Sequence, residues 1–394
     1  MGEKEIEYIN LDYSGWKKLS EEWNDKSRFF ESVYFIYGFD LSSNIYIINT
    51  GDGLVMIDGG NDYTSFLQLR DIGFSHGDIK KIILTHGHPE HVMGVIELLR
   101  YPEFMRNTMF EVVMHESAPK EFKNILDNFK IKYTFVSHGD KIEVGDFLLE
   151  VVHTPGHTFD SICFFEATTK TLFSGDTVLP FAYASSDPNA GGREDYHLLS
   201  LKMLERYGIS NLLPGHGPVV YGRANEIIKA NKLAAIKKMV GEYAPWSEIA
   251  VELAKKRWFE EAIDACDVAI GEDPNNLEIK KLKASILNDL GRFDEASKLF
   301  AQLEDILVND PFVKLGKAIS SIGMGKFDEA MAILDSLKEK YSNVKEVDVY
   351  RGICFVLKGE PEKAMEIDGF RMEFVKSFEK ILSREKFSED KGKT

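Results

Sequence analysis

The segment KIILTHGHPEH (81–91) decides how this sequence is interpreted. The β-rich run KIILT (81–85) leads directly into His86, His88, Glu90 and His91, so four side chains that can bind a metal lie within six residues. A single histidine at a strand end would be read as a core or capping residue. This density after a predicted buried strand indicates a metal site.

Three further motifs place an ionisable residue beside glycine, close to the end of a predicted strand. They are HTPGHT (153–158) with His157, SGDT (174–177) with Asp176 and PGHGP (214–218) with His216. Glycine allows a sharp turn that presents the neighbouring side chain at the strand end. All ten histidines lie between residues 76 and 216, so histidine chemistry belongs to the first part of the chain.

The first part, which we place at residues 1–242, alternates between strands and helices. Two strand-rich blocks, each followed by helices, predict two packed sheets with helices outside, an αββα sandwich of the α/β class. We expect strands at 33–38, 44–49, 54–58, 81–85, 111–114, 147–152, 161–166, 171–174 and 211–213. We expect helices at 62–73, 91–101, 117–128, 195–207 and 222–240.

The second part, residues 243–394, repeats with a period of 34 residues. The recurring segments are RWFEEA (257–262), GRFDEA (291–296), GKFDEA (325–330) and GEPEKA (359–364). Such a period is typical of stacked helical hairpins, and small residues at matched positions let their helices approach closely. The pattern resembles the tetratricopeptide repeat, which implies an all-α superhelix with units at 243–276, 277–310, 311–344 and 345 to about 372. We expect the stretch 371–386 to form a C-terminal capping helix.

The four histidine and aspartate motifs, in this order, together with LVMIDGG (54–60), resemble the metallo-β-lactamase superfamily over about residues 30–240. HTPGHT followed by SGDT is most similar to its thioesterase branch, which includes glyoxalase II. The resemblance implies a first metal bound by His86, His88 and His157. It implies a second metal bound by Glu90, His91 and His216, with Asp176 bridging the two ions and with Glu90 and Asp176 as the catalytic carboxylates.

Glu90 departs from the family pattern, which usually has aspartate at this position. The longer side chain leaves three outcomes open: a second site that still forms, one that prefers another metal, or a mononuclear centre. Imidazole and carboxylate ligands suit zinc first, with iron or manganese as alternatives. We expect two divalent metal ions.

The remaining polar residues of the first part receive simpler interpretations. Asp58 is expected to contact a metal-binding imidazole, because a buried carboxylate at a strand end needs a partner. His153 is expected to fix the loop that carries His157 or to pack at a strand end, rather than to bind metal. The other histidines are expected at the surface or at strand ends; they are His76, His115, His138 and His197.

We therefore interpret the chain as a metal-dependent hydrolase that uses a metal-bound hydroxide on an ester, thioester or related small substrate. The repeats would serve protein interaction or oligomerisation, and lysines such as Lys280 and Lys314 suggest an acidic peptide partner. Two other functions stay open. One is an iron-dependent enzyme that handles oxygen or persulfides, and the other is a non-catalytic metal-binding adaptor.

Composition indicates the cellular location and disfavours some classes of partner. The formal net charge is −16, and neither part is basic, so a nucleic-acid partner is not favoured. No apolar run reaches the ~20 residues that a membrane helix needs. The N-terminal segment lacks the features of a signal peptide, and three widely spaced cysteines suit a reducing compartment, so we expect a cytoplasmic protein.

Overall fold

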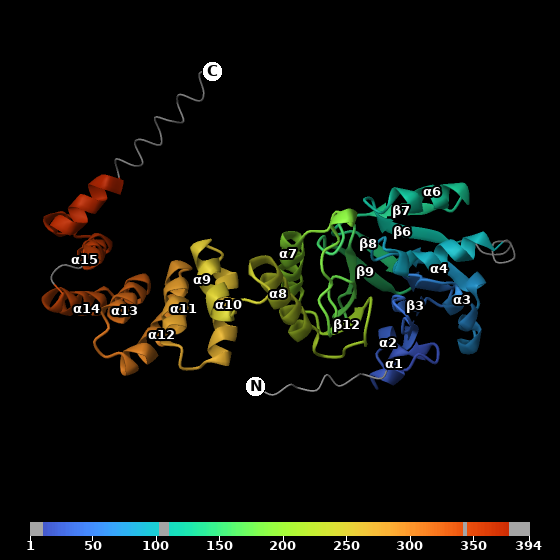
Figure 1. Cartoon of the computed structure of the whole chain (residues 1–394), viewed down its shortest axis with the longest axis horizontal. Coiled ribbons are helices and arrows are strands. Elements are labelled where there is room, and N and C mark those ends of the chain that lie inside the picture. Colours follow the sequence, from blue (N-terminus) through green and yellow to red (C-terminus); the bar gives the residue numbers. More distant parts are fainter. Residues whose placement is uncertain (1–10, 102–109, 342–344, 378–394) are drawn as a thin grey trace, which may run out of the picture. The chain divides into compact units, whose positions relative to one another are not determined.

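The computed structural model describes residues 11–101, 110–341 and 345–377, and the chain divides into two compact units, Met1–Met239 and Val240–Thr394 (Figure 1). In the first unit, seven strands form one sheet in sequence order. Strands β1 to β4 pair antiparallel and β4 to β7 pair parallel. The strands are β1 (Lys17–Lys18), β2 (Val33–Ile36), β3 (Ile45–Asn49), β4 (Leu54–Ile57), β5 (Ile79–Ile83), β6 (Glu111–His115) and β7 (Tyr133–Val136).

A second sheet of five strands has the order β12-β11-β10-β9-β8. Its members are β8 (Lys141–Val144), β9 (Phe147–His153), β10 (Ile162–Glu166), β11 (Thr171–Gly175) and β12 (Asn211–Pro214). The helices of this unit are α1 (Leu19–Glu22), α2 (Arg28–Ser32), α3 (Thr64–Gln68), α4 (Pro89–Arg100), α6 (Lys120–Asn128), α7 (Glu194–Leu204) and α8 (Ala224–Val240).

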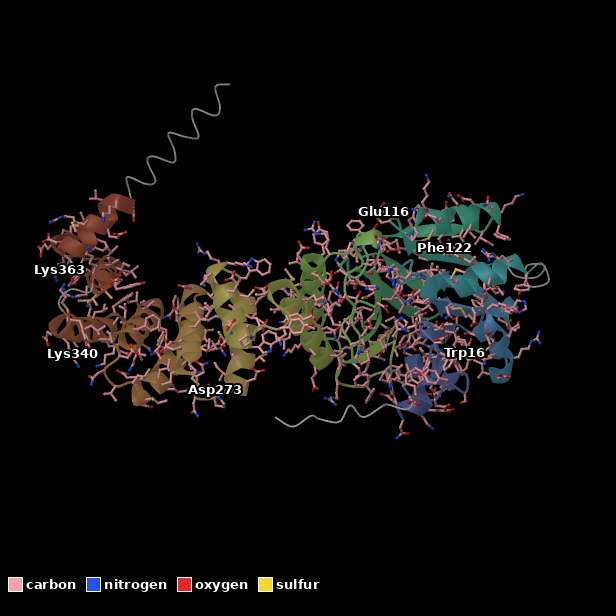
Figure 2. The ribbon with its side chains drawn as sticks, in the orientation of Figure 1. Trp16, Glu116, Phe122, Asp273, Lys340 and Lys363 are labelled. Carbon is pink, nitrogen blue, oxygen red and sulfur yellow. The ribbon has the colours of Figure 1, made fainter. Side chains whose placement is uncertain are left out.

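The two faces of the first sheet carry different cores. On one face, Ile47 joins a cluster with Trp16 and with Phe122 of α6, both labelled in Figure 2. On the other face, Ile48 joins a cluster that contains Phe164 of the second sheet. Successive residues of one strand point to opposite faces, so this alternation buries one face under helices and the other against the second sheet. The predicted αββα sandwich is confirmed.

Three short strands were not expected from the sequence. The two-residue β1 and the four-residue β7 lie at the two edges of the first sheet, and the four-residue β8 lies at an edge of the second sheet. Edge strands have one unpaired side and expose polar residues such as Lys141 and Glu143 of β8, so their hydrophobic pattern is weak. The predicted helix at 62–73 is shorter than expected, because α3 passes into a 3₁₀ turn, Leu69–Ile72, that ends at Gly73.

The second unit consists of helix pairs that follow the 34-residue period. The pairs are α9 (Trp246–Lys255) with α10 (Phe259–Glu272), α11 (Leu277–Asp289) with α12 (Phe293–Ile306), α13 (Pro311–Gly323) with α14 (Phe327–Lys340), and α15 (Lys345–Leu357) with α16 (Pro361–Glu366). The turn inside three pairs contains a glycine with positive φ: Gly291, Gly325 and Gly359, at 74°, 75° and 81°. In the first pair the same position is Arg257, with φ 62°.

Small residues lie where the helices of a pair cross, as the period predicted. Ala262, Ala296, Ala330 and Ala364 are all fully buried. A Cβ at Gly352 would lie 2.2 Å from the ring of Phe370, so only glycine fits there. Of the predicted capping helix, residues 371–377 are helical and residues 378–386 lie outside the described residues. Among the described residues, no helix is long and apolar enough to cross a membrane.

Candidate metal centre

The HGHPEH segment connects β5 to α4 at the carboxyl end of the parallel strands. Its tight path needs glycine, because a Cβ at Gly87 would lie 2.1 Å from the Pro119 ring. His88 is the residue before α4, and Pro89 occupies the first helical position, where a missing N–H costs nothing. The imidazoles of His86 and His91 are thereby buried, at 3% and 0% exposed.

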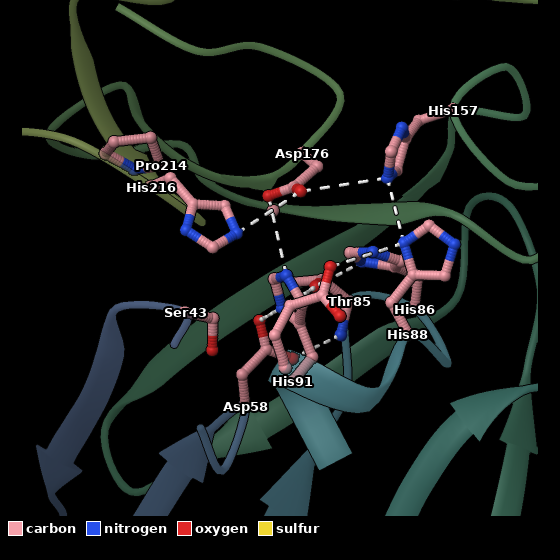
Figure 3. Close-up of polar contacts among 12 residues, drawn as sticks. Ser43, Asp58, Thr85, His86, His88, His91, His157, Asp176, Pro214 and His216 are labelled. Atoms are coloured by element: carbon pink, nitrogen blue, oxygen red, sulfur yellow. Dashed lines mark hydrogen bonds and ion pairs between the residues drawn. The ribbon is translucent and has the colours of Figure 1, made fainter. Parts of the chain in front are cut away.

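The second sheet presents three further predicted side chains to the same place (Figure 3). His157 lies in the loop between β9 and β10, Asp176 follows β11 directly, and His216 follows β12 after one residue. The flanking glycines permit this approach, since a Cβ at Gly215 would lie 2.1 Å from Asp176 Oδ1. Residues far apart in sequence thus meet where the two sheets face each other.

The seven side chains form two groups of potential ligand atoms. In each group the ligand atoms lie within 4.8 Å of one another. Asp176 faces both groups, because its Oδ1 lies 3.5 Å from His91 Nε2 and its Oδ2 lies 3.7 Å from His157 Nε2. The first group is His86, His88 and His157, and the second is Glu90, His91, Asp176 and His216.

The donor atoms fit a divalent cation. His86 Nε2, His91 Nε2 and Asp176 Oδ1 are buried without a hydrogen-bond partner, and an unpaired buried polar atom is costly. Two atoms that are each ~2.0–2.1 Å from one tetrahedral ion lie about 3.4 Å apart. The 3.5 Å between His91 and Asp176, and the 3.4 Å between His216 Nε2 and Asp176 Oδ2, match this spacing.

The electrostatics of the cluster also favour a cation. Burial holds the pKa of His86 well below its ordinary value, so this ring is neutral and carries a free lone pair. Burial opposes protonation of His91 as well, but the carboxylates of Asp58 and Asp176 outweigh it and raise its pKa to about 10. Burial would raise the pKa of Asp176, but His91 and His216 bring it well below its ordinary value. The acidic side chains therefore hold a positive charge between them.

Glu90 lies in the first turn of α4, and its side chain is 31% exposed. Its carboxylate belongs to the second group, while Oε1 is 3.7 Å from His88 Nδ1 of the first. The glutamate that replaces the family's usual aspartate therefore reaches the second group and also approaches the first.

Two contacts expected around the ligands are present. Asp58 Oδ2 lies 2.8 Å from His91 Nδ1, and the carboxylate also accepts hydrogen bonds from the backbone and hydroxyl of Thr85. His153 Nε2 lies 2.9 Å from the carbonyl oxygen of Phe159, in the loop that carries His157. His153 thus fixes this loop.

The expectation for His197 was wrong. His197 is not at the surface or a strand end; it is fully buried on α7, with Nε2 2.8 Å from the carbonyl of Thr177 and its ring stacked on Tyr183. Its helical neighbours Leu198 and Leu201 are buried too, because α7 packs this side onto the domain.

The sequence interpretation also missed two residues beside the ligands. Asp160 is buried, accepts a hydrogen bond from Thr158 and is hydrogen-bonded to the backbone of Gly87, so it connects the two ligand loops. Asp187 lies 3.1 Å from His88 Nε2. Asp160 could have been found from the sequence, since it lies only three residues after His157. Asp187 could not, because it is 99 residues from His88.

Comparison with known proteins agrees with this architecture. Residues 38–216 match the family model of the metallo-beta-lactamase superfamily, and residues 256–318 match that of the tetratricopeptide repeat. A metallo-beta-lactamase family protein from Thermus thermophilus is similar in structure, with TM-score 0.43 and 20% identity over 61% of this chain and 94% of that chain.

Curated relatives include thioesterases. The atrochrysone carboxyl ACP thioesterase nsrC of Aspergillus novofumigatus is 26% identical over 66% of this chain and 69% of its own length. The thioesterase pkgB of Emericella nidulans is 27% identical over 50% of this chain, and the beta-lactamase-like protein 2 homolog of Caenorhabditis elegans is 26% identical over 45%. The matches span only 53% and 57% of the length of these last two relatives. The chain contains a domain of the metallo-β-lactamase superfamily followed by tetratricopeptide repeats.

Proposed function

We propose that the first domain is a metal-dependent hydrolase that cleaves a thioester or ester. The observation that carries this proposal is the position of Asp176 between the two ligand groups, 3.5 Å from His91 and 3.7 Å from His157. A carboxylate that faces both groups suits two neighbouring cations, whose repulsion needs a bridging anion. The thioesterase names of two relatives favour a thioester as the substrate class.

His86, His88 and His157 would hold one ion, and Glu90, His91, Asp176 and His216 the other. When bound, divalent cations lower the pKa of water towards ~7 and stabilise negative charge on a substrate oxygen. The chain's own part is to position the reactants. Burial keeps His86 neutral, so this ring offers a free lone pair, and Asp176 is placed to accept a hydrogen bond from the attacking water. Glu90 and His216, with side chains 31% and 29% exposed, border the side from which substrate enters.

The reaction on a thioester balances without any further reactant. The oxygen of water forms a bond to the carbonyl carbon, and the carbon–sulfur bond breaks. One proton of the water passes to the departing thiolate, and the products are a carboxylic acid and a thiol. No redox partner is needed.

The experiment compares metal content and turnover for the wild-type chain and Asp176→Ala. Wild-type protein purified without chelator should contain near two equivalents of metal and hydrolyse aryl thioester probes. Asp176→Ala should keep its circular dichroism spectrum but lose at least 100-fold in kcat/KM. One equivalent in the active wild-type protein would replace the dinuclear arrangement by a mononuclear one, and undiminished turnover after chelation would overturn the hydrolase proposal.

We propose that residues 243–394 act as an arm for protein interaction or oligomerisation. Several cations of the first helices are engaged by carboxylates of the preceding helix. Lys317 Nζ lies 2.7 Å from Glu304, Arg351 lies 2.8 Å from Asp335, and Lys283 pairs with Asp267. Among the predicted docking cations, Lys280 and Lys314 form no ion pair in the described part of the repeats, so they are available to an acidic partner.

The domain boundary at 242/243 is a separate proposal, supported by the compact unit that ends at Met239. A chain truncated after residue 242 should fold, bind metal and keep its activity on small thioesters. Insoluble protein, or loss of metal from the truncated chain, would show that the repeats complete the catalytic domain.

A further inference from the structure

The segment 185–187 contacts two proposed ligands of the first metal from outside the cluster. Ser185 offers its carbonyl oxygen to His157, 2.9 Å from Nδ1. Asp187 offers its carboxylate to His88, with Oδ2 3.1 Å from Nε2. The two imidazoles come from different loops, but a single three-residue segment contacts both.

These contacts determine which nitrogen of each ring carries the proton. A carbonyl or carboxylate oxygen accepts hydrogen bonds, so His157 must donate from Nδ1 and His88 must donate from Nε2. The lone pairs are then on His157 Nε2 and His88 Nδ1, the two atoms that lie 3.0 Å apart. Two lone pairs at this distance repel each other unless a cation lies between them. The segment thus prepares both rings for the same ion.

The position of Asp187 is itself strongly constrained. Its backbone N–H donates to the carbonyl of His157 at 2.7 Å. Asp187 also caps the short 3₁₀ turn Pro188–Ala190, because its Oδ1 accepts from the N–H of Asn189. The backbone at Gly192 also passes close to the carbonyl oxygen of His157, since a Cβ at Gly192 would lie 2.1 Å from it. Each oxygen of the carboxylate therefore has one role, and Oδ2 is directed to His88.

We propose that Asp187 is a positioning residue of the first metal site. It fixes the orientation and tautomer of His88, and together with the Ser185 carbonyl it raises the affinity of the first group for a divalent cation. This inference rests on the proposed metal-dependent function. Contacts of this kind, from a carboxylate to the outer nitrogen of a ligating histidine, typically change metal affinity 10–100-fold.

The test uses Asp187→Ser in the full chain. Serine caps helical turns about as well as aspartate, so the bond to Asn189 is kept, but its hydroxyl is too short to reach His88. Asp195→Asn is the matched control, because it removes a carboxylate of the neighbouring helix that pairs with the exposed Arg193. All proteins carry His216→Ala, which weakens the second group and leaves the first group to be measured.

The affinity for Zn(II) is measured by competition with a chromophoric chelator. We expect Asp187→Ser to bind Zn(II) 10–100-fold more weakly and Asp195→Asn to bind like its parent. Long-range ¹H–¹⁵N spectra of metal-free, ¹⁵N-histidine-labelled protein give a second readout. His88 should carry its proton on Nε2 in the parent and populate the other tautomer in Asp187→Ser, a change that a purely structural role would not produce.

Two results would overturn the inference, and they are distinguishable. Equal Zn(II) affinity in Asp187→Ser and its parent would show that Asp187 does not position His88, while the proposed hydrolase function would stand. Failure of the wild-type chain to bind any divalent metal would remove both the function and the inference.

Discussion

Asp58 Oδ2 lies 2.8 Å from Nδ1 of the fully buried His91, on the side of the ring opposite Asp176. Asp58 also has φ 60°, a left-handed conformation that few side chains adopt without cost. The carboxylate accepts a hydrogen bond from His91 Nδ1, and Nε2 of the same ring faces Asp176. Asp58 thereby orients His91, which among the seven proposed ligands is the one completely inaccessible to solvent.

Replacement of Asp58 should weaken the second ligand group. Asp58→Asn is the informative variant, because asparagine tolerates positive φ and differs mainly in charge. We expect 10–100-fold weaker binding of the second metal equivalent, with the first equivalent unchanged, as measured by chelator competition. The control is Asp62→Asn, an exposed residue after the same strand. Equal affinities in Asp58→Asn and wild type would mean that His91 needs no carboxylate.

The carboxylate of Glu90 should determine whether a second ion is retained. Glu90→Ala removes a carboxylate from the second group, so the metal content should fall from near two equivalents towards one. Glu90→Asp, which keeps the carboxylate, should retain two equivalents but change the rate or the metal preference. Elemental analysis after dialysis measures both, with His138→Ala as a control at an exposed histidine. Two tightly bound equivalents in Glu90→Ala would place this side chain outside the coordination sphere.

His115 should make the first domain sensitive to acid. Burial, together with the stacked ring of His153, lowers its pKa to about 4 from an ordinary 6.5. Below pH 6.5 the unfolded chain takes up this proton before the folded one. The free energy of unfolding should therefore fall by about 2–3 kcal/mol between pH 6.5 and 4.

His115→Asn should remove this part of the pH dependence. Asparagine does not titrate, yet its amide oxygen can still accept the hydrogen bond that Ser117 N–H donates to His115 Nδ1. Urea unfolding of chelated protein at pH 7 and pH 4.5 compares the two chains without a contribution from metal loss. Parallel pH profiles for wild type and His115→Asn would contradict the assignment.

Arg257→Gly should stabilise the repeats. Arg257 has φ 62° at the position where the other three described pairs have glycine, and a left-handed conformation costs a non-glycine residue about 1 kcal/mol. We expect the urea midpoint, followed by helical circular dichroism, to rise by an amount equivalent to about 0.5–1 kcal/mol. Gly291→Ala is the mirror-image control and should be destabilised, and a lower midpoint for Arg257→Gly would show that Arg257 makes contacts worth more than its strain.

The fold was predictable where the sequence carries a strong period. Strand β3 alternates between two buried faces, and the small residues of the repeats recur every 34 positions, so both architectures could be inferred from local patterns. Strands β7 and β8 could not, because edge strands owe their form to pairing with a neighbour rather than to their own sequence. His197 was misplaced for a related reason: its burial depends on how α7 packs.

The ligand motifs and the neighbouring Asp58 could be predicted from the sequence, whereas the contacts from Ser185 and Asp187 could not. All seven proposed ligands are brought together by the structure, while their binding of metal stays a prediction. The Ser185 carbonyl could not have been found, since a backbone oxygen leaves no trace in the residue type. The sequence suggested that lysines of the repeats meet an acidic peptide, but Lys317 is engaged by Glu304 of the preceding helix, a contact that depends on how the helices stack.

Two side chains of β3 and its preceding loop link the sheets beside the site. Tyr46 Oη and Asn44 Nδ2, from the first sheet, donate to the carbonyl of Pro214, two residues before His216, at 2.6 and 3.0 Å. These hydrogen bonds fix the position of His216 relative to the first sheet, which carries His86, His88 and His91. It follows that a substitution buried between the sheets, if it shifts one sheet against the other by a fraction of an ångström, would change the spacing of the proposed ligands without touching any of them.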